Sequence, residues 1–325
     1  MNEAAENGAR GGWRQAASWA ARVAVSAVLL SWLWRQHGRD ALSCLSPRTE
    51  LWVLIGVPLY LGCQLLNALK WQVILDAMGH RVPYRELVRV TLIGMFANFF
   101  VPTSVGGDVV RVGLARAWGV SLSLGALSVF TQRVTGLVAL LVIGLGGALA
   151  AGELDSRLVR GVLVGMALLL LGVLLGAWAG MRFDPEGRRL PRWLARPVGK
   201  LAAGLRSLAG SPRQMLWVMV LSFAFQLWQV GLNVLLGGPA GVRARVVDYL
   251  WVGPVVALGA MVPAGLGGIG SREAAALVLK PVLGPAYLTW SLLWQAMVLL
   301  ASLPGGLLMA GSARRRAKPA AEQGV

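Results

Sequence analysis

Long apolar stretches separated by short polar ones make up most of the chain. Six of these stretches reach the length of about 20 mostly apolar residues that a helix needs to cross a bilayer. They are residues 16–34, 50–75, 121–150, 158–181, 214–236 and 285–311. The pattern predicts an all-α integral membrane protein, a polytopic bundle with six full spans.

Two further apolar stretches, 87–117 and 246–280, are broken near their middle. Each has a helix-like arm, then proline and glycine, then a second short arm. Broken backbone is tolerated at membrane depth only where protein or a water-filled cavity surrounds it. We therefore interpret each stretch as a re-entrant helical hairpin that returns to its starting side. The alternative is that both stretches cross the bilayer as kinked helices, which gives eight spans.

The basic residues predict which side each loop faces. Segment 182–213 holds eight Lys or Arg, and the tail contains the run ARRRAK at 313–318. Both are expected in the cytoplasm, together with the N-terminal tail, because cytoplasmic loops carry an excess of Lys and Arg. The two hairpins then enter from opposite sides, which is typical of an inverted repeat with a substrate site near the midplane.

This topology predicts a single transmembrane domain, 16–311, between cytoplasmic tails 1–15 and 312–325. We expect it in the inner (cytoplasmic) membrane, with 182–213 as a basic segment lying on the cytoplasmic surface. The alternative for 182–213 is an ordinary basic loop that only sets the topology.

Composition supports a membrane protein and narrows its partners. The chain is 56% hydrophobic and only 14% charged, whereas soluble proteins carry about 25% charged residues. Its net charge of +17 lies beside apolar spans, so we expect the anionic membrane surface as partner and no nucleic acid. Two cysteines and two histidines form no metal or redox motif, so no metal and no cofactor is predicted.

The first break carries charge inside an apolar stretch. Asp108 and Arg111 are three residues apart, so on a helix they share a face and can pair. A charge near the bilayer centre costs about 2.5–3.5 kcal/mol, which favours a functional role. The N-terminus of the second arm offers N–H groups to an anion beside Arg111. The candidate substrate-binding residues are Asn98, Pro102, Gly106, Gly107, Asp108 and Arg111.

Each candidate in that break has an expected part. Pro102 ends the first arm, and Asn98 can bond to the freed backbone groups. Gly106 and Gly107 allow backbone conformations that other residues resist. A purely structural alternative is that Asp108 and Arg111 only hold the hairpin together.

The second break repeats this plan. Pro263 stops the first arm, glycines form the loop, and Ser271 is an expected N-cap. Arg272 and Glu273 open the next helix, although Arg272 could instead extend to the outer interface. The candidate substrate-binding residues here are Pro263, Gly267, Gly268, Gly270, Ser271, Arg272 and Glu273.

Arg133, within the span 121–150, is a third candidate for substrate binding. It needs a partner, which Asp108 or a bound phosphate could supply. The alternative is that Arg133 lies near enough to the cytoplasmic end to reach the interface. Lys70 and Asn67, in the second span, are weaker candidates.

Three segments together resemble a known family. They are ANFFVPTSVGGDVVR (97–111), TQRVTGL (131–137) and MVPAGLGGIGSREAAAL (261–277). They are similar to the lysylphosphatidylglycerol synthase transmembrane region family, also called UPF0104 or flippase-like, over about 16–311. Many members carry Glu-Arg where this chain has Gln132 and Arg133.

The resemblance implies lipid translocation. In two-domain relatives this region flips a charged aminoacyl lipid made by an attached synthase domain. We expect this chain to be a stand-alone form that moves an anionic or phosphate-bearing lipid and is not an enzyme. Three alternatives stay open: a non-catalytic membrane partner of a lipid-modifying synthase or glycosyltransferase, a membrane transferase, and a conventional carrier of an ion or small solute. A homo-oligomer is also considered.

Overall fold

The computed structural model describes Ser31, Arg35, Arg206 and the ranges 49–100, 106–152, 157–182, 210–262 and 269–322. Within this part the regular structure is all helical, with no strand, as the apolar pattern predicts. The expected span 16–34 and most of the basic segment 182–213 lie outside the described residues. So do four candidates in the hairpin loops: Pro102, Pro263, Gly267 and Gly268.

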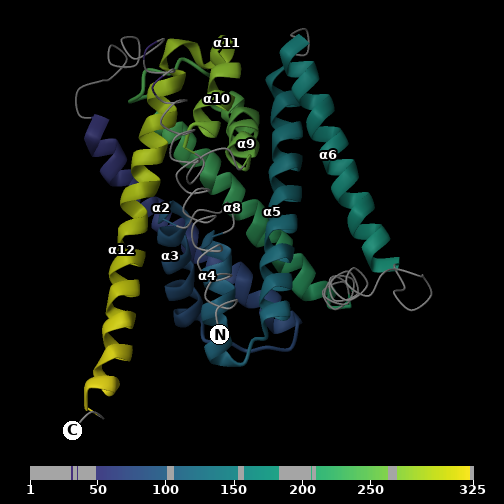
Figure 1. Cartoon of the computed structure of the whole chain (residues 1–325). Helices are drawn as coiled ribbons and strands as arrows, with labels where there is room; N and C mark the ends of the chain where they lie inside the picture. Colours follow the sequence, from purple (N-terminus) through teal and green to yellow (C-terminus); the bar gives the residue numbers. More distant parts are fainter. Residues whose placement is uncertain are drawn as a thin grey trace, which may run out of the picture.

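Five long apolar helices coincide with five of the six predicted spans. Each is long and apolar enough to cross a membrane, and they form the frame of the molecule (Figure 1). They are α2 (Thr49–Ala77), α5 (Leu122–Ala151), α6 (Arg157–Arg182), α8 (Pro212–Gly237) and α12 (Tyr287–Glu322).

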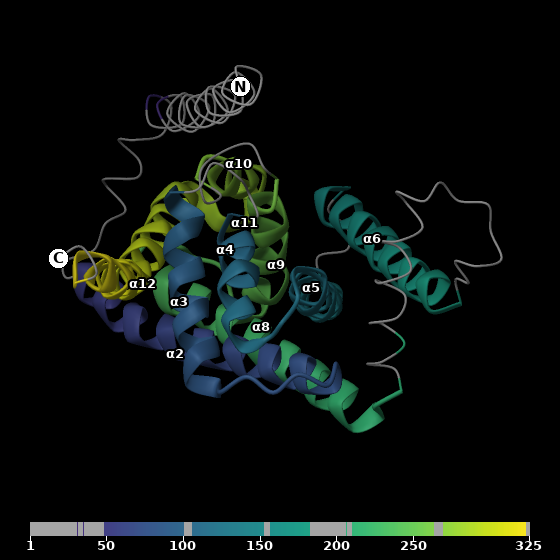
Figure 2. The same ribbon diagram turned by 60° about the horizontal axis from the view of Figure 1, so that its bottom comes forward.

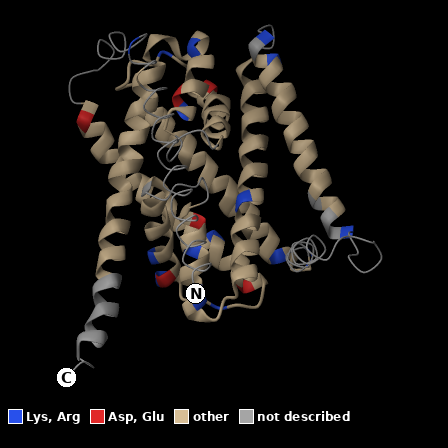
Figure 3. Cartoon of the chain, in the orientation of Figure 1, with Lys and Arg blue, Asp and Glu red and all other residues tan. Residues whose placement is uncertain are grey.

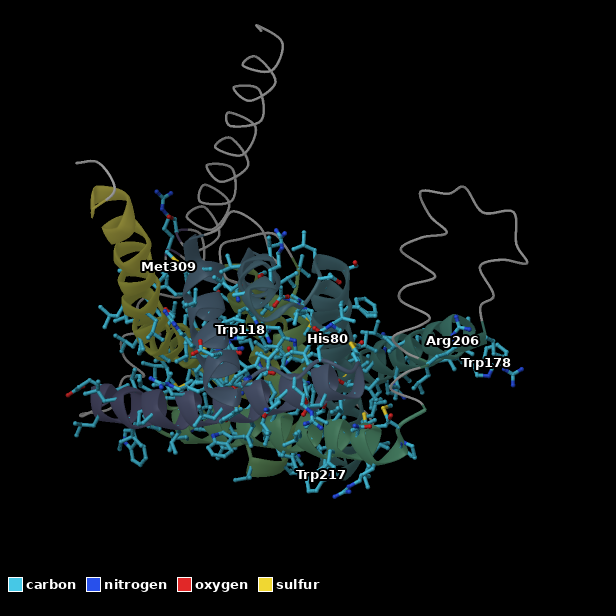
Figure 4. The ribbon with its side chains drawn as sticks, turned by 90° about the horizontal axis from the view of Figure 1, so that it is seen from below. His80, Trp118, Trp178, Arg206, Trp217 and Met309 are labelled. Carbon is cyan, nitrogen blue, oxygen red and sulfur yellow. The ribbon has the colours of Figure 1, made fainter. Side chains whose placement is uncertain are left out.

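The first broken stretch forms two short antiparallel helices, α3 (Tyr84–Phe100) and α4 (Gly106–Ala115). At 1.5 Å per residue, α4 is about 15 Å long, too short for a hydrocarbon core of about 30 Å. Val82 before α3 and Trp118 after α4 pack in one hydrophobic cluster, so the stretch ends where it began. Seen from below, His80 and Trp118 lie on the same face of the bundle (Figure 4).

The second broken stretch has the same form. Helix α9 (Tyr249–Ala260) is followed by α10 (Ser271–Val278), and a short helix α11 (Lys280–Leu283) leads to α12. In Figure 1, α3 and α4 occupy the lower half of the bundle and α9 to α11 the upper half. This arrangement favours two opposed hairpins over the eight-span alternative, while the total span count and the inverted repeat stay predictions.

Close helix contacts hold the hairpins in the frame. Helices α2 and α8 run side by side along one face, and α5 stands beside α9 (Figure 2). Helix α12 crosses α3 at Gly305, where an added Cβ would lie 2.0 Å from the carbonyl oxygen of Leu92. Helix α6 packs against α5, while Trp178 near its end is far from His80 and Trp118 (Figure 4). The hairpins are therefore fixed by α2, α5, α8 and α12.

Candidate functional site

A cavity of about 650 Å³ lies at mid-height in the bundle. Its lining runs along α2 from Tyr60, near the middle of that helix, to Lys70 in its C-terminal third, and Met261 at the end of α9 borders it from the other hairpin. Basic and acidic positions gather around α4 in the lower half of the bundle (Figure 3). Its other described polar lining residues are Gln64, Asn67, Thr91, Asn98, Asp108, Arg111, Gln132, Arg133 and Gln226. The cavity is thus at the depth where a transporter with opposed hairpins would hold its substrate.

Arg111 is the buried cation of the first hairpin. Its Nη2 donates a hydrogen bond of 2.8 Å to Oε1 of Gln132, and its Nη1 lies 3.4 Å from Oδ1 of Asp108. The guanidinium carbon lies 4.3 Å from the centre of the Trp71 ring, a cation–π contact. Its Nε is buried and has no hydrogen-bond partner. One N–H donor of this cation therefore remains unused.

Asp108 pairs with two arginines. Besides Arg111, its Oδ2 accepts a hydrogen bond from Nε of Arg133 and contacts an Nη of the same side chain. The side chain of Arg133 is 50% exposed, whereas that of Arg111 is 9% exposed. Asp108 thus joins the inner cation to one at the mouth of the cavity. The predicted pairing of Asp108 with Arg111 is confirmed, and Asp108 is the partner that Arg133 needed.

Gln132 connects three helices at the base of the cavity. Its Nε2 donates to the carbonyl oxygen and to Oδ1 of Asn67 on α2, at 2.7 and 2.8 Å. This orients its Oε1 toward Arg111. Its backbone carbonyl accepts a 2.9 Å hydrogen bond from Nζ of Lys70, which is 2% exposed. Gln132 therefore contacts two buried cations, Arg111 through its side-chain amide and Lys70 through its backbone carbonyl.

Close backbone contact fixes the start of α4. The backbone N–H of Gly107 donates to Oδ1 of Asn98 at 2.8 Å, so the predicted capping by Asn98 is confirmed. A Cβ on Gly107 would lie 2.2 Å from the carbonyl oxygen of Gly94. Gly106 and Gly107 are helical without positive φ, so the expectation of unusual backbone was wrong. Gly107 is needed because α3 and α4 approach closely.

Arg272 has a similar setting in the second hairpin. It is 4% exposed, and its Nη2 donates to Oδ1 of Asn233 on α8 at 3.1 Å. Its guanidinium carbon lies 4.6 Å from the ring centre of Trp294 and 5.3 Å from that of Trp290, both on α12. Its Nε is also buried without a hydrogen-bond partner. Each hairpin therefore holds one arginine against tryptophan and a neutral amide.

Glu273 caps the N-terminus of its own helix, α10. Its Oε2 accepts the backbone N–H of Gly270 at 2.7 Å, and its Oε1 accepts the hydroxyl of Ser291 at 2.9 Å. Gly270, with φ of 89°, is the N-cap residue, and Ser271 is the first helical residue. The prediction that Ser271 is the N-cap was wrong, because the carboxylate of Glu273 reaches the start of the helix instead.

Tyr60 connects the two arginine sites. It lines the cavity and meets Trp294 edge to face, with ring centres 6.0 Å apart. Trp294 in turn covers Arg272. One pair of aromatic rings thus lies between Arg272 and the cavity that Arg111 lines.

The predicted residues divide into three groups. Asn98, Asp108, Arg111 and Arg133 line the cavity, while Gly106 and Gly107 are buried at the start of α4 beside them. Gly270, Ser271, Arg272 and Glu273 are together in α10 and its cap but are not among the described lining residues. The remaining loop residues lie outside the described part, as stated above.

Sequence reasoning gave too little weight to the polar face of α2. Tyr60, Gln64, Asn67 and Lys70 all line the cavity. Their spacing of four, three and three residues puts them on one face of a helix. Such a polar face inside an apolar span was the signal available in the sequence.

Comparison with known proteins agrees with the membrane architecture. The family model described as "Lysylphosphatidylglycerol synthase TM region" matches residues 19–307. A "UPF0104 membrane protein" of Archaeoglobus fulgidus is 24% identical over 112 residues, which are 34% of this chain and 33% of that relative. The aligned part therefore covers about a third of the relative's length. Since the family match covers most of the sequence, this chain belongs to the lysylphosphatidylglycerol synthase TM region family of multi-pass membrane proteins.

Proposed function

We propose that this protein translocates a lipid with an anionic, phosphate-bearing head group across the cytoplasmic membrane, without catalysing a covalent change. The observation that carries the proposal is the cavity at mid-height, which combines buried cations with an apolar wall. Its substrate partner is then a membrane lipid rather than a soluble ion.

The cationic side of the cavity suits a phosphate. Arg111 has an unused N–H donor, and Arg133 extends from the mouth toward the same carboxylate. Guanidinium groups bind phosphate oxygens through charge-assisted hydrogen bonds. Intramembrane charges of this kind are costly and typically belong to a substrate pathway.

The apolar side suits the start of an acyl chain. Phe130, Val134 and Leu137 line the cavity on the face of α5 that carries Arg133. The side chain of Phe130 is 45% exposed and that of Arg133 is 50% exposed. The cavity therefore opens along α5, and a head group could lie inside while its tails stay in the bilayer.

The second arginine site would supply a second binding position for the head group. Arg272 lies beyond Tyr60 and Trp294, in a hairpin that we propose enters from the opposite side. Alternate exposure of Arg111 and Arg272, by movement of one hairpin against the other, would carry the head group across. This scheme needs no nucleotide or metal.

The experiment uses purified protein in liposomes that contain head-group-labelled lipids. We measure how much inner-leaflet label becomes accessible to an impermeant quencher. The proposal predicts protein-dependent loss of protection for anionic lipids, and less of it for a zwitterionic lipid. Protection equal to that of protein-free liposomes, for every anionic lipid in the panel, contradicts it.

A further inference from the structure

Beyond lipid translocation itself, the charge balance of the cavity points to a narrower class of head group. Among its described lining residues, Lys70, Arg111 and Arg133 are basic and Asp108 is acidic. Three cations against one carboxylate leave two net positive charges. The other polar groups there are amides, hydroxyls and backbone, so they bring no further charge.

Gln132 is the residue that keeps this balance positive. Its side-chain amide meets Arg111 at the point where a carboxylate would neutralise that cation, and its backbone carbonyl accepts a hydrogen bond from Lys70. Its two hydrogen bonds to Asn67 fix the amide so that oxygen, not nitrogen, faces Arg111. Gln132 thus accepts a hydrogen bond from Arg111 without adding a negative charge, so Asp108 is the one carboxylate among the described lining residues of the cavity.

Buried positive charge without compensation is unfavourable. A head group with one negative charge would leave one net positive charge in the cavity, while a head group with two would balance it. The unused donors fit the same conclusion. Nε of Arg111 has no partner, and Lys70 has three N–H donors, of which one reaches Gln132.

We infer that the cavity selects a lipid phosphomonoester, which carries two negative charges, over a phosphodiester lipid, which carries one. Lys70 and Gln132 are the specificity-determining residues. Lys70 supplies a cation, and Gln132 places a neutral amide where a carboxylate would cancel a positive charge. The inference rests on the proposed lipid substrate, and it adds the charge and the phosphate type of the head group.

The test measures equilibrium binding to the purified full-length protein in a non-ionic detergent. The probes are phosphatidic acid and phosphatidylglycerol with identical acyl chains and the same fluorophore at the tail. The buffer is held at about pH 7, above the second pKa of a phosphomonoester, which is about 6. We expect wild type to bind phosphatidic acid about tenfold more tightly than phosphatidylglycerol, because one more charge pair forms in a medium of low dielectric constant. Equal affinities overturn the inference.

Two variants test the residues named. Gln132→Glu adds a carboxylate beside Arg111 and should remove most of the preference for phosphatidic acid. Lys70→Gln removes a cation and should do the same, which keeps the test decisive if Gln132→Glu fails to fold. Gln214→Glu, at the start of α8 outside this cavity, adds the same charge and should leave the preference unchanged. Retention of the preference in both folded cavity variants contradicts the assignment.

Competition separates a lipid from free phosphate. Unlabelled phosphatidic acid should displace the probe, whereas inorganic phosphate at the same concentration should not, because it makes no contact with the apolar wall. Equal displacement by both overturns the lipid part of the inference. Translocation of both lipids without selective binding overturns this inference alone, and selective binding without translocation overturns the proposed function alone.

Discussion

Oε1 of Gln132 accepts a 2.8 Å hydrogen bond from Arg111, so a neutral amide holds the buried cation of the first hairpin. The second hairpin repeats the relationship, since Asn233 accepts a 3.1 Å hydrogen bond from Arg272. Each guanidinium also lies against tryptophan, and each has a buried Nε without a partner. Neither amide neutralises its arginine, and the carboxylate of Asp108 is shared between Arg111 and Arg133.

Replacement of Arg272 tests whether the second site takes part in transport. We expect Arg272→Ala to lower the translocation rate to the protein-free background, because the described residues place no other cation against Trp290 or Trp294. Arg272→Lys should recover only part of the rate, since an ammonium lacks the planar fork of the guanidinium. The rate is measured in liposomes, with detergent-phase unfolding as a check on folding. A wild-type rate in Arg272→Ala would remove this site from the pathway.

Two glycines of α4 make a matched pair for stability. A Cβ on Gly107 would collide with the carbonyl oxygen of Gly94, whereas nothing lies within 4 Å of a Cβ on Gly113. We expect Gly107→Ala to lower the free energy of unfolding by about 1–3 kcal/mol through overpacking. Gly113→Ala should raise it by about 0.5–1 kcal/mol, because alanine favours a helix interior.

Thermal unfolding of the two glycine variants in the same detergent gives this comparison. Equal changes in unfolding temperature for Gly107→Ala and Gly113→Ala would mean that α3 and α4 do not approach as closely as described.

Asp108→Asn tests the acid that joins the two cations. The change leaves Arg111 and Arg133 without their shared carboxylate, so the net positive charge of the cavity rises by one. We predict tighter binding of an anionic lipid and slower translocation, because release becomes harder. Asp76→Asn, at the exposed end of α2, removes the same charge outside the cavity and should change neither. Weaker binding in Asp108→Asn would contradict the charge account.

The local features of the site could be predicted from sequence. Asp108 and Arg111 pair because residues three apart share a helix face, whatever the tertiary structure. Asn98 caps the second arm because the break leaves N–H groups that need an acceptor. The breaks themselves follow from proline and glycine inside apolar stretches, which is why the hairpins could be placed.

Contacts between distant helices could not be predicted in the same way. That Gln132 meets Lys70 and Asn67 depends on the relative depth and rotation of α5 and α2, which no local pattern sets. The N-cap error at Ser271 has a similar cause, since Glu273 is held by Ser291 from α12 as well as by its own helix. The cavity forms only when the relative depth and rotation of these helices are fixed.

The most direct test compares the initial rate of lipid translocation for wild type, Arg111→Ala and Arg160→Ala in the same anionic liposomes. Arg160 is an exposed arginine of α6 outside the described cavity lining, so it matches the change in charge and size. The account predicts a rate in Arg111→Ala at the protein-free background, with Arg160→Ala equal to wild type. A wild-type rate in folded Arg111→Ala would contradict the proposal that the head group passes through this cavity.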